Sequence, residues 1–296
     1  MNFLKSSPLK ALFHKLLAIN CLVLTISSCS SSVSTNAIAS SSNEKVYAVS
    51  AQNSAIALGK FDNANWMQLW GVRKGGQWGL TNTKVIKDPS GRFGKFLRVN
   101  YPKGSASPQV SRENNASLGG AQFYADLGIA PKNSLRLSYY LRFSENFNFV
   151  KGGKLPGLFG GKGNSGGKIP NGSDGFSTRF MWRQNGAGEV YAYLPTSTEY
   201  GTSIGRGNWQ FVKGTWHHLE QVVVLNDPNS QNGSIQVWLD GKQVLNEDNL
   251  TFRNTNALQI EGIFFSTFFG GGDPSWATPK NVYIDFADFS VSEVTK

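Results

Sequence analysis

Residues 175–183, GFSTRFMWR, and 189–195, EVYAYLP, decide how this chain folds, because both alternate in character with period two. Consecutive side chains of a β-strand point to opposite faces, so every second residue shares a surface. In the first stretch one face is Phe176, Thr178, Phe180 and Trp182, and the other is Ser177, Arg179, Met181 and Arg183. In the second, Val190, Ala192 and Leu194 oppose Glu189, Tyr191, Tyr193 and Pro195. Both stretches are therefore predicted to be strands with one face in a core.

The five residues that join these strands, QNGAG at 184–188, are rich in turn formers and predict a hairpin. A five-residue loop would pair Arg183 with Glu189, Met181 with Tyr191, and Arg179 with Tyr193, and directly paired residues share a face. The hairpin would then gather a polar patch with Cβ separations of roughly 5 Å across the strands. Its members would be Ser177, Arg179, Tyr191 and Tyr193. An even-length loop without a bulge would split the patch.

Similar alternating stretches recur on both sides of this hairpin, at 95–101, 134–143, 258–269 and 281–291. Asp240-Gly241 lies between two further alternating runs and is a strong hairpin signal. Aromatic residues make up 12% of the chain and glycines number 33, which suits short strands joined by tight turns. We therefore predict an all-β fold, an antiparallel β-jelly-roll sandwich, as a single domain over residues 46–296.

The first 28 residues are predicted to be an export signal, since lysines precede an apolar run too short to span a bilayer. Residues 29–45 are dominated by serine and are expected to form a flexible tether. Ile26-Ser27-Ser28-Cys29 resembles a bacterial lipoprotein cleavage box, so lipidated Cys29 could anchor the protein to a membrane. The expected location is outside the cell or, as a lipoprotein, the bacterial outer membrane.

The net charge of +10 favours an anionic partner, and removal of residues 1–28 still leaves +7. No basic cluster or nucleic-acid motif accompanies the charge, so nucleic acid is not expected as a partner. Adjacent His217 and His218 would point to opposite strand faces, so no metal site is expected. The glycine pattern at 161–166 continues into Gly167 and Pro170 where a nucleotide-binding helix would begin, so no cofactor is expected.

Four motifs occur in a distinctive order: GGKLPGLFGG (152–161), GFSTRFMWR, VYAYLP and FFGGGDPSWATP (268–279). Together they resemble polysaccharide lyase family 14, over about residues 135–289. The resemblance implies a jelly-roll enzyme that cleaves an acidic polysaccharide, alginate or a related polyuronate, by β-elimination and without a cofactor. It also implies an active cleft lined by the residues that match the family's motifs. These are Lys154, Ser177, Arg179, Tyr191 and Tyr193.

β-Elimination from a uronate needs a cation at the C5 carboxylate, a base for the C5 proton and an acid for the departing O4. Our hypothesis gives Arg179 and Lys154 the carboxylate, and Tyr191 and Tyr193 the acid and base roles. A cation about 4 Å from a tyrosine could lower its pKa by roughly three. Alternatively, Lys154 is itself the base if desolvation lowers its pKa. We expect the remaining substrate contacts from Ser177, Lys151, Arg183 and Trp276.

Two alternatives stay open beside a lyase acting on mannuronate-rich alginate. One is a glucuronan lyase, because glucuronate and mannuronate polymers present the same carboxylate. The other is a non-catalytic carbohydrate-binding module, because TWHHLEQVVVLN followed by GSIQVWLDGKQV also resembles the sheet of lectin-like sandwiches. A binding module has no need for two tyrosines beside two cations. A jelly-roll glycosidase is disfavoured, since the sequence lacks the Glu-x-Asp-x-x-Glu spacing of its carboxylate pair.

Overall fold

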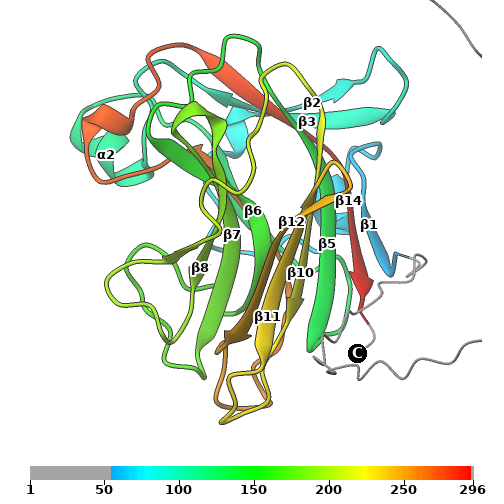
Figure 1. The fold of residues 1–296 in the computed structure, drawn as a ribbon. Coiled ribbons are helices and arrows are strands. Elements are labelled where there is room, and N and C mark those ends of the chain that lie inside the picture. Colours follow the sequence, from blue (N-terminus) through cyan, green and yellow to red (C-terminus); the bar gives the residue numbers. More distant parts are fainter. Residues whose placement is uncertain (1–54, 295–296) are drawn as a thin grey trace, which may run out of the picture. The chain divides into compact units, whose positions relative to one another are not determined.

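The computed structural model describes residues 55–294, which form two antiparallel sheets of a jelly roll. The predicted export signal, the tether and the first residues of the predicted domain lie outside this range. Figure 1 shows strands β6–β8 in one layer and β5, β10, β11, β12 and β14 in the other. No helix within residues 55–294 is long and apolar enough to cross a membrane.

The strands of the eight-stranded sheet run, in spatial order, β12 (Lys242–Leu250), β11 (Gly233–Leu239), β10 (His217–Val224), β5 (Ser134–Phe143), β14 (Val282–Glu293), β3 (Lys95–Tyr101) and β2 (Thr83–Lys87), with β1 (Ala57–Gly59) also paired to β14. The six-stranded sheet runs β4 (Ala121–Ala125), β13 (Gly262–Phe269), β6 (Gly152–Gly161), β7 (Gly175–Arg183), β8 (Gly188–Tyr193) and β9 (Thr202–Ile204). The helices are short: α1 (Trp66–Leu69), α2 (Pro108–Glu113), and the 3-10 turns η1 (Leu80–Asn82), η2 (Gln184–Gly186) and η3 (Pro274–Trp276).

Period two predicted most of these strands. The alternating stretches at 95–101, 134–143 and 175–183 coincide with β3, β5 and β7. The turn between β11 and β12 is confirmed at Asp240-Gly241, where both residues have positive φ, 52° and 81°. Glycine and aspartate tolerate this conformation, which matches the twist of the strands that they join.

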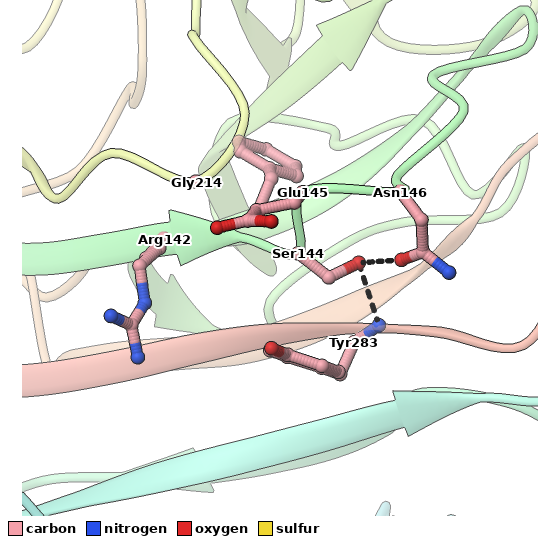
Figure 2. Close-up of a pocket in the computed structure, with 7 residues that line it drawn as sticks. Arg142, Ser144, Glu145, Asn146, Gly214 and Tyr283 are labelled. Atoms are coloured by element: carbon pink, nitrogen blue, oxygen red, sulfur yellow. Dashed lines mark hydrogen bonds between the residues drawn. The ribbon is translucent and has the colours of Figure 1, made fainter.

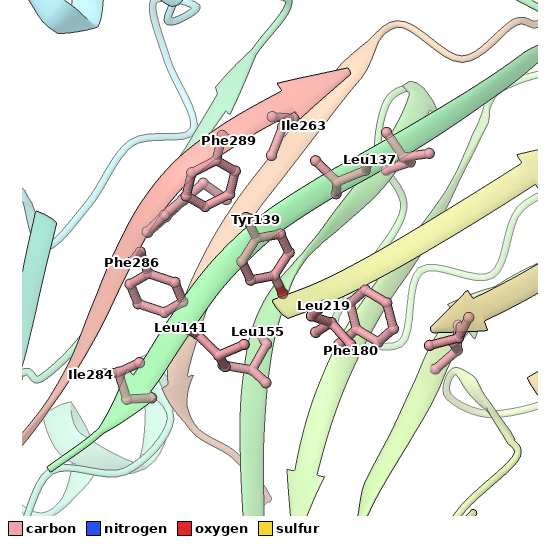
Figure 3. Packing of buried hydrophobic residues seen from close by; sticks show 14 of the residues in the cluster. Leu137, Tyr139, Leu141, Leu155, Phe180, Leu219, Ile263, Ile284, Phe286 and Phe289 are labelled. Carbon is pink, nitrogen blue, oxygen red and sulfur yellow. The ribbon is translucent and has the colours of Figure 1, made fainter. Parts of the chain in front are cut away.

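The core lies between the two sheets and is built from the inward faces of their strands. Tyr139 and Phe289 of the eight-stranded sheet stack with ring centroids 4.7 Å apart, and Leu155 and Phe180 of the other sheet are fully buried. Figure 3 shows these side chains converging from both layers. Because alternate residues enter this core, those between them face outward from each sheet.

The register of the β7–β8 hairpin differs from the prediction by two residues. Arg179 pairs with Tyr191 and Ser177 with Tyr193, whereas the predicted partner of Arg179 was Tyr193. The loop between the last paired residues, Trp182 and Gly188, still holds five residues, 183–187, but begins one position earlier than predicted. A shift of two preserves which face each side chain occupies, so the predicted polar patch still forms.

Strand β6 contains a bulge at Pro156. Lys154 pairs with Met181 and Leu155 with Phe180. The next pair joins Gly157 to Arg179, so Pro156 has no partner residue on β7. An extra residue reverses the alternation beyond it. As a result, Leu155 and Leu158 both enter the core, although three residues separate them, and Lys154 points outward on the same face as Arg179.

Candidate active site

The outer face of the six-stranded sheet brings four predicted residues together: Lys154 from β6, Arg179 from β7, and Tyr191 and Tyr193 from β8. The β6–β7–β8 register places them in successive levels along the strands. Lys154 lies beside Met181 and Glu189, Arg179 beside Tyr191, and Tyr193 one level further. We call these four residues the candidate site.

Lys154 is a nearly buried lysine, with 9% of its surface exposed. Its Nζ lies 3.0 Å from the sulfur of Met181 and 4.3 Å from the ring centroid of Tyr191. Burial lowers the pKa of Lys154 well below its usual value, and the nearby charges of Arg179 and Arg183 lower it further. Glu189 opposes this shift but does not outweigh it. A lysine in this setting supplies a neutral amine far more readily than one in water.

Arg179 is 2% exposed and has no carboxylate within 4.0 Å among the described residues. Its Nη1 donates to Ser266 Oγ at 3.1 Å, and its guanidinium lies 4.5 Å from the ring centroid of Phe264. Its Nε has no partner in the described part of the chain. Burial lowers the pKa of Arg179 to about 10, so the side chain remains a cation near neutral pH. Arg179 is therefore a buried positive charge that still has N–H groups available to donate hydrogen bonds.

Tyr191 and Tyr193 stand side by side, with their ring centroids 5.8 Å apart and their planes nearly perpendicular. Burial raises the pKa of Tyr191 to about 12, and Tyr193 contributes in the same direction. This is the reverse of the activation by neighbouring cations expected from the sequence, because Arg183 and Arg179 lower the pKa by less than burial raises it. Tyr191 therefore stays protonated near neutral pH and is suited to donate a proton.

The connection between β6 and β7 is held against the far end of the candidate site. Tyr193 Oη accepts a hydrogen bond from the backbone N–H of Gly167 at 3.0 Å. Ser177 is fully buried, and its hydroxyl donates to the carbonyl of Asn164 at 2.6 Å. Ser177 thus holds this loop in place, and its predicted contact with substrate stays a prediction.

Arg183 forms an ion pair with Glu189, and its guanidinium lies 5.7 Å from the Tyr191 ring centroid. Glu189 is fully buried, and Arg206 approaches its other oxygen at 3.8 Å. The sequence placed Glu189 on the same face as the tyrosines but gave it no role. In the structure it forms an ion pair with Arg183, whereas Arg179 and Lys154 have no carboxylate within 4.0 Å among residues 55–294.

Lys151 and Trp276 lie together beyond the Lys154 end of the site. Lys151 donates to Ser275 Oγ, and its Nζ lies 5.9 Å from the Trp276 ring centroid. The segment between β13 and η3 passes close to Lys154, since a Cβ on Gly270 would lie 3.5 Å from Lys154 Nζ. Lys151 and Trp276 therefore flank the candidate site, as a substrate-binding role requires.

Strands β4 and β13 add residues that sequence reasoning missed. Ser266 Oγ bridges Arg179 to Gln122 Oε1 at 3.2 Å, and Tyr124 stacks on Phe264 with ring centroids 4.2 Å apart. A faint signal existed in the alternation of IFFSTFF at 263–269, where Phe264, Ser266 and Phe268 share a face. Both faces of this strand are rich in aromatic residues, however, so the pattern could not show which one is buried.

The two strand histidines lie in the other sheet, on β10. His217 contacts Asp240 and Val212, and His218 contacts Ser138, so neither is part of the candidate site. Within residues 55–294 no three His, Cys, Asp or Glu side chains gather as metal ligands would.

Chemically, the site combines a buried arginine cation, a buried lysine whose pKa is lowered and a protonated tyrosine, and neither Arg179 nor Lys154 has a carboxylate within 4.0 Å in the described part of the chain. An anionic group placed at Arg179 would gain charge-assisted hydrogen bonds in a poorly solvated setting. A neutral lysine could remove a proton, and Tyr191 could deliver one.

Comparisons with known proteins point to polysaccharide lyases by both sequence and structure. The profile of the family described as polysaccharide lyase 14 matches residues 90–289. The crystal structure of a PL-14 alginate lyase from Aplysia kurodai is 34% identical, with a TM-score of 0.65, and the match covers 74% of this chain and 90% of that one. Alginate lyase vAL-1 from Chlorella virus is 22% identical (TM-score 0.68, 81% and 100% covered). An endo-β-1,4-glucuronan lyase from Trichoderma reesei is 12% identical (TM-score 0.53, 81% and 96% covered). A search of curated proteins found no match.

Proposed function

The chain belongs to polysaccharide lyase family 14, and from this premise we propose that it cleaves alginate, preferentially in mannuronate-rich stretches, by β-elimination. The observation that carries the proposal is a buried cation, Arg179, beside a buried lysine of lowered pKa, Lys154, neither of which has a carboxylate within 4.0 Å among the described residues. The alginate lyase from Aplysia kurodai, at 34% identity, supports the choice of polymer.

In the proposed mechanism Arg179 binds the C5 carboxylate of the uronate. Its cationic charge and free donors neutralise the carboxylate, which makes the C5 proton more acidic and stabilises the developing enolate. The stack on Phe264 and the bond to Ser266 fix the plane of the guanidinium. A fixed donor set aimed at the developing charge is more effective than mobile water.

Lys154 is the proposed base. Its lowered pKa supports this role over the tyrosine base that we also considered from the sequence. The neutral amine takes the C5 proton, the C4–O4 bond breaks as the C4–C5 double bond forms, and Tyr191 protonates the departing O4. Proton transfers of this kind typically contribute 10²–10⁴-fold to rate.

The test is ultraviolet absorbance during incubation of the purified protein with polymannuronate, polyguluronate and glucuronan separately. Elimination creates a conjugated unsaturated uronate, whereas hydrolysis does not. We expect the fastest rise with polymannuronate, and a rate about 10²-fold lower in Tyr191→Phe. Tyr193→Phe should lose less, because its hydroxyl accepts the Gly167 N–H.

Other results would redirect the proposal. A rise with glucuronan alone would favour glucuronan lyase, which the similarity in fold to the Trichoderma reesei enzyme also allows. A normal rate in Tyr191→Phe would remove the acid role from this tyrosine.

A further inference from the structure

A pocket with a volume of about 950 Å³ lies next to the Lys154 end of the candidate site. Pockets of roughly 300–1,000 Å³ hold drug-sized ligands, so this one can admit several sugar rings. The pocket continues directly from the site strands, since Lys151 precedes Gly152, which pairs with Arg183, and Gln184 follows Arg183.

Three lysines from three separate connections line the pocket: Lys151, Lys213 and Lys280. Lys213 and Lys280 are exposed and have no carboxylate within 4.0 Å among the described residues. Glu145 is the one acid in the lining, which leaves two formal positive charges in excess. Lysines brought together in this way attract an anionic chain.

The rest of the lining suits a sugar. Phe147 and Phe149 are 1% and 8% exposed and form an apolar floor. The side chains of Gln184 and Asn185 are exposed at the rim, where they can meet hydroxyl groups. Cations, amides and an apolar floor together match a polyuronate, which carries a carboxylate and hydroxyls on each ring.

An adjoining smaller pocket lacks the unpaired lysines of the large pocket. It shares Glu145 and Asn146 with the large pocket and has a volume of about 340 Å³ (Figure 2). Its cation, Arg142, is already paired with Asp285 at 2.9 Å. The small pocket therefore offers no unpaired cation among the described residues, unlike the large pocket.

We propose that the pocket lined by Lys151, Lys213 and Lys280 binds the stretch of the polymer that extends beyond the residue being cleaved. The inference rests on the proposed function and deepens it, because it assigns the enzyme a distal binding site for long polyuronate chains. Short oligosaccharides that fill only the candidate site would not reach it.

The test compares the full-length protein with Lys213→Gln/Lys280→Gln on polymannuronate and on its trisaccharide. We expect KM for the polymer to rise roughly three- to tenfold relative to KM for the trisaccharide, the range expected for two exposed ion pairs. Added salt should reduce the difference, since it screens exposed charges.

The matched control is Lys84→Gln/Lys242→Gln, which removes the same charge from exposed positions at opposite edges of the eight-stranded sheet. An unchanged KM for the polymer in the pocket variant would overturn the proposal, as would an equal rise in the control. If no substrate is cleaved by the wild type, the proposed function fails. Retardation in polymannuronate-containing gels would then still test the pocket, and equal retardation of the wild type and the pocket variant would overturn it.

Discussion

The outer faces of both sheets place cationic side chains over aromatic rings, but the two faces differ in whether a carboxylate also contacts the cation. On the eight-stranded sheet Arg98 lies over Tyr283 at 3.4 Å and Arg142 over Trp216 at 4.6 Å, and both bond to fully buried Asp285. On the six-stranded sheet Arg179 lies over Phe264 and Lys154 over Tyr191, and no carboxylate of residues 55–294 lies within 4.0 Å of either cationic group. A cation on an aromatic ring therefore does not by itself indicate a functional site. The indication comes from the lack of a carboxylate partner for that cation among the described residues.

The largest effect should come from Lys154→Met, which would sharpen this comparison. Loss of the base should lower kcat by about 10²–10⁴-fold. The lowered pKa of Lys154 means that the unfolded chain binds more protons, so wild-type stability rises with pH between that lowered pKa and the usual lysine value. At neutral pH methionine removes this penalty, and each kcal/mol gained should raise Tm by about 2–4 °C.

Calorimetry and the absorbance assay on the same preparation check both parts. A variant that is inactive and less stable than the wild type would contradict the view that Lys154 is kept at a cost in stability. In the wild type, activity should rise with pH as Lys154 loses its proton.

The second test pairs Arg179→Lys with Arg142→Lys. Lysine keeps the charge but loses the planar set of donors, so Arg179→Lys should lower kcat by about 10²–10³-fold. Arg142→Lys, on the other face, should leave kcat unchanged. Equal losses of activity in both variants would break the comparison, because the paired arginine would then matter as much as the unpaired one.

The smallest effect concerns the paired face itself. Asp285→Asn should lower the free energy of unfolding by about 1–3 kcal/mol, because charge-assisted bonds from Arg98 and Arg142 are lost, while kcat stays unchanged. Urea unfolding measures the difference. Glu293→Gln, which breaks the exposed pair with Lys132, is the control and should change stability by less than about 1 kcal/mol. A loss of activity in Asp285→Asn would mean that the two faces are coupled.

The sequence predicted the fold and the central part of the site because both depend on period two, which a strand displays locally. Ser177, Arg179, Tyr191 and Tyr193 were placed together even though the register was wrong, since an error of two residues leaves the faces unchanged. Gln122 and Ser266 were missed because their place depends on β4 and β13 lying beyond β6, which no local pattern reveals. The raised pKa of Tyr191 and the lowered pKa of Lys154 depend on burial, which the sequence does not state.

The bulge at Pro156 also bears on how this sheet can change over evolutionary time. The residues on its two sides follow opposite parities, so deletion of this one position would turn either Lys154 inward or Leu158 outward. Proline has no N–H to contribute to a ladder and suits the extra position. The spacing between Lys154 and Leu158 is therefore one that descendants of this sequence must inherit intact.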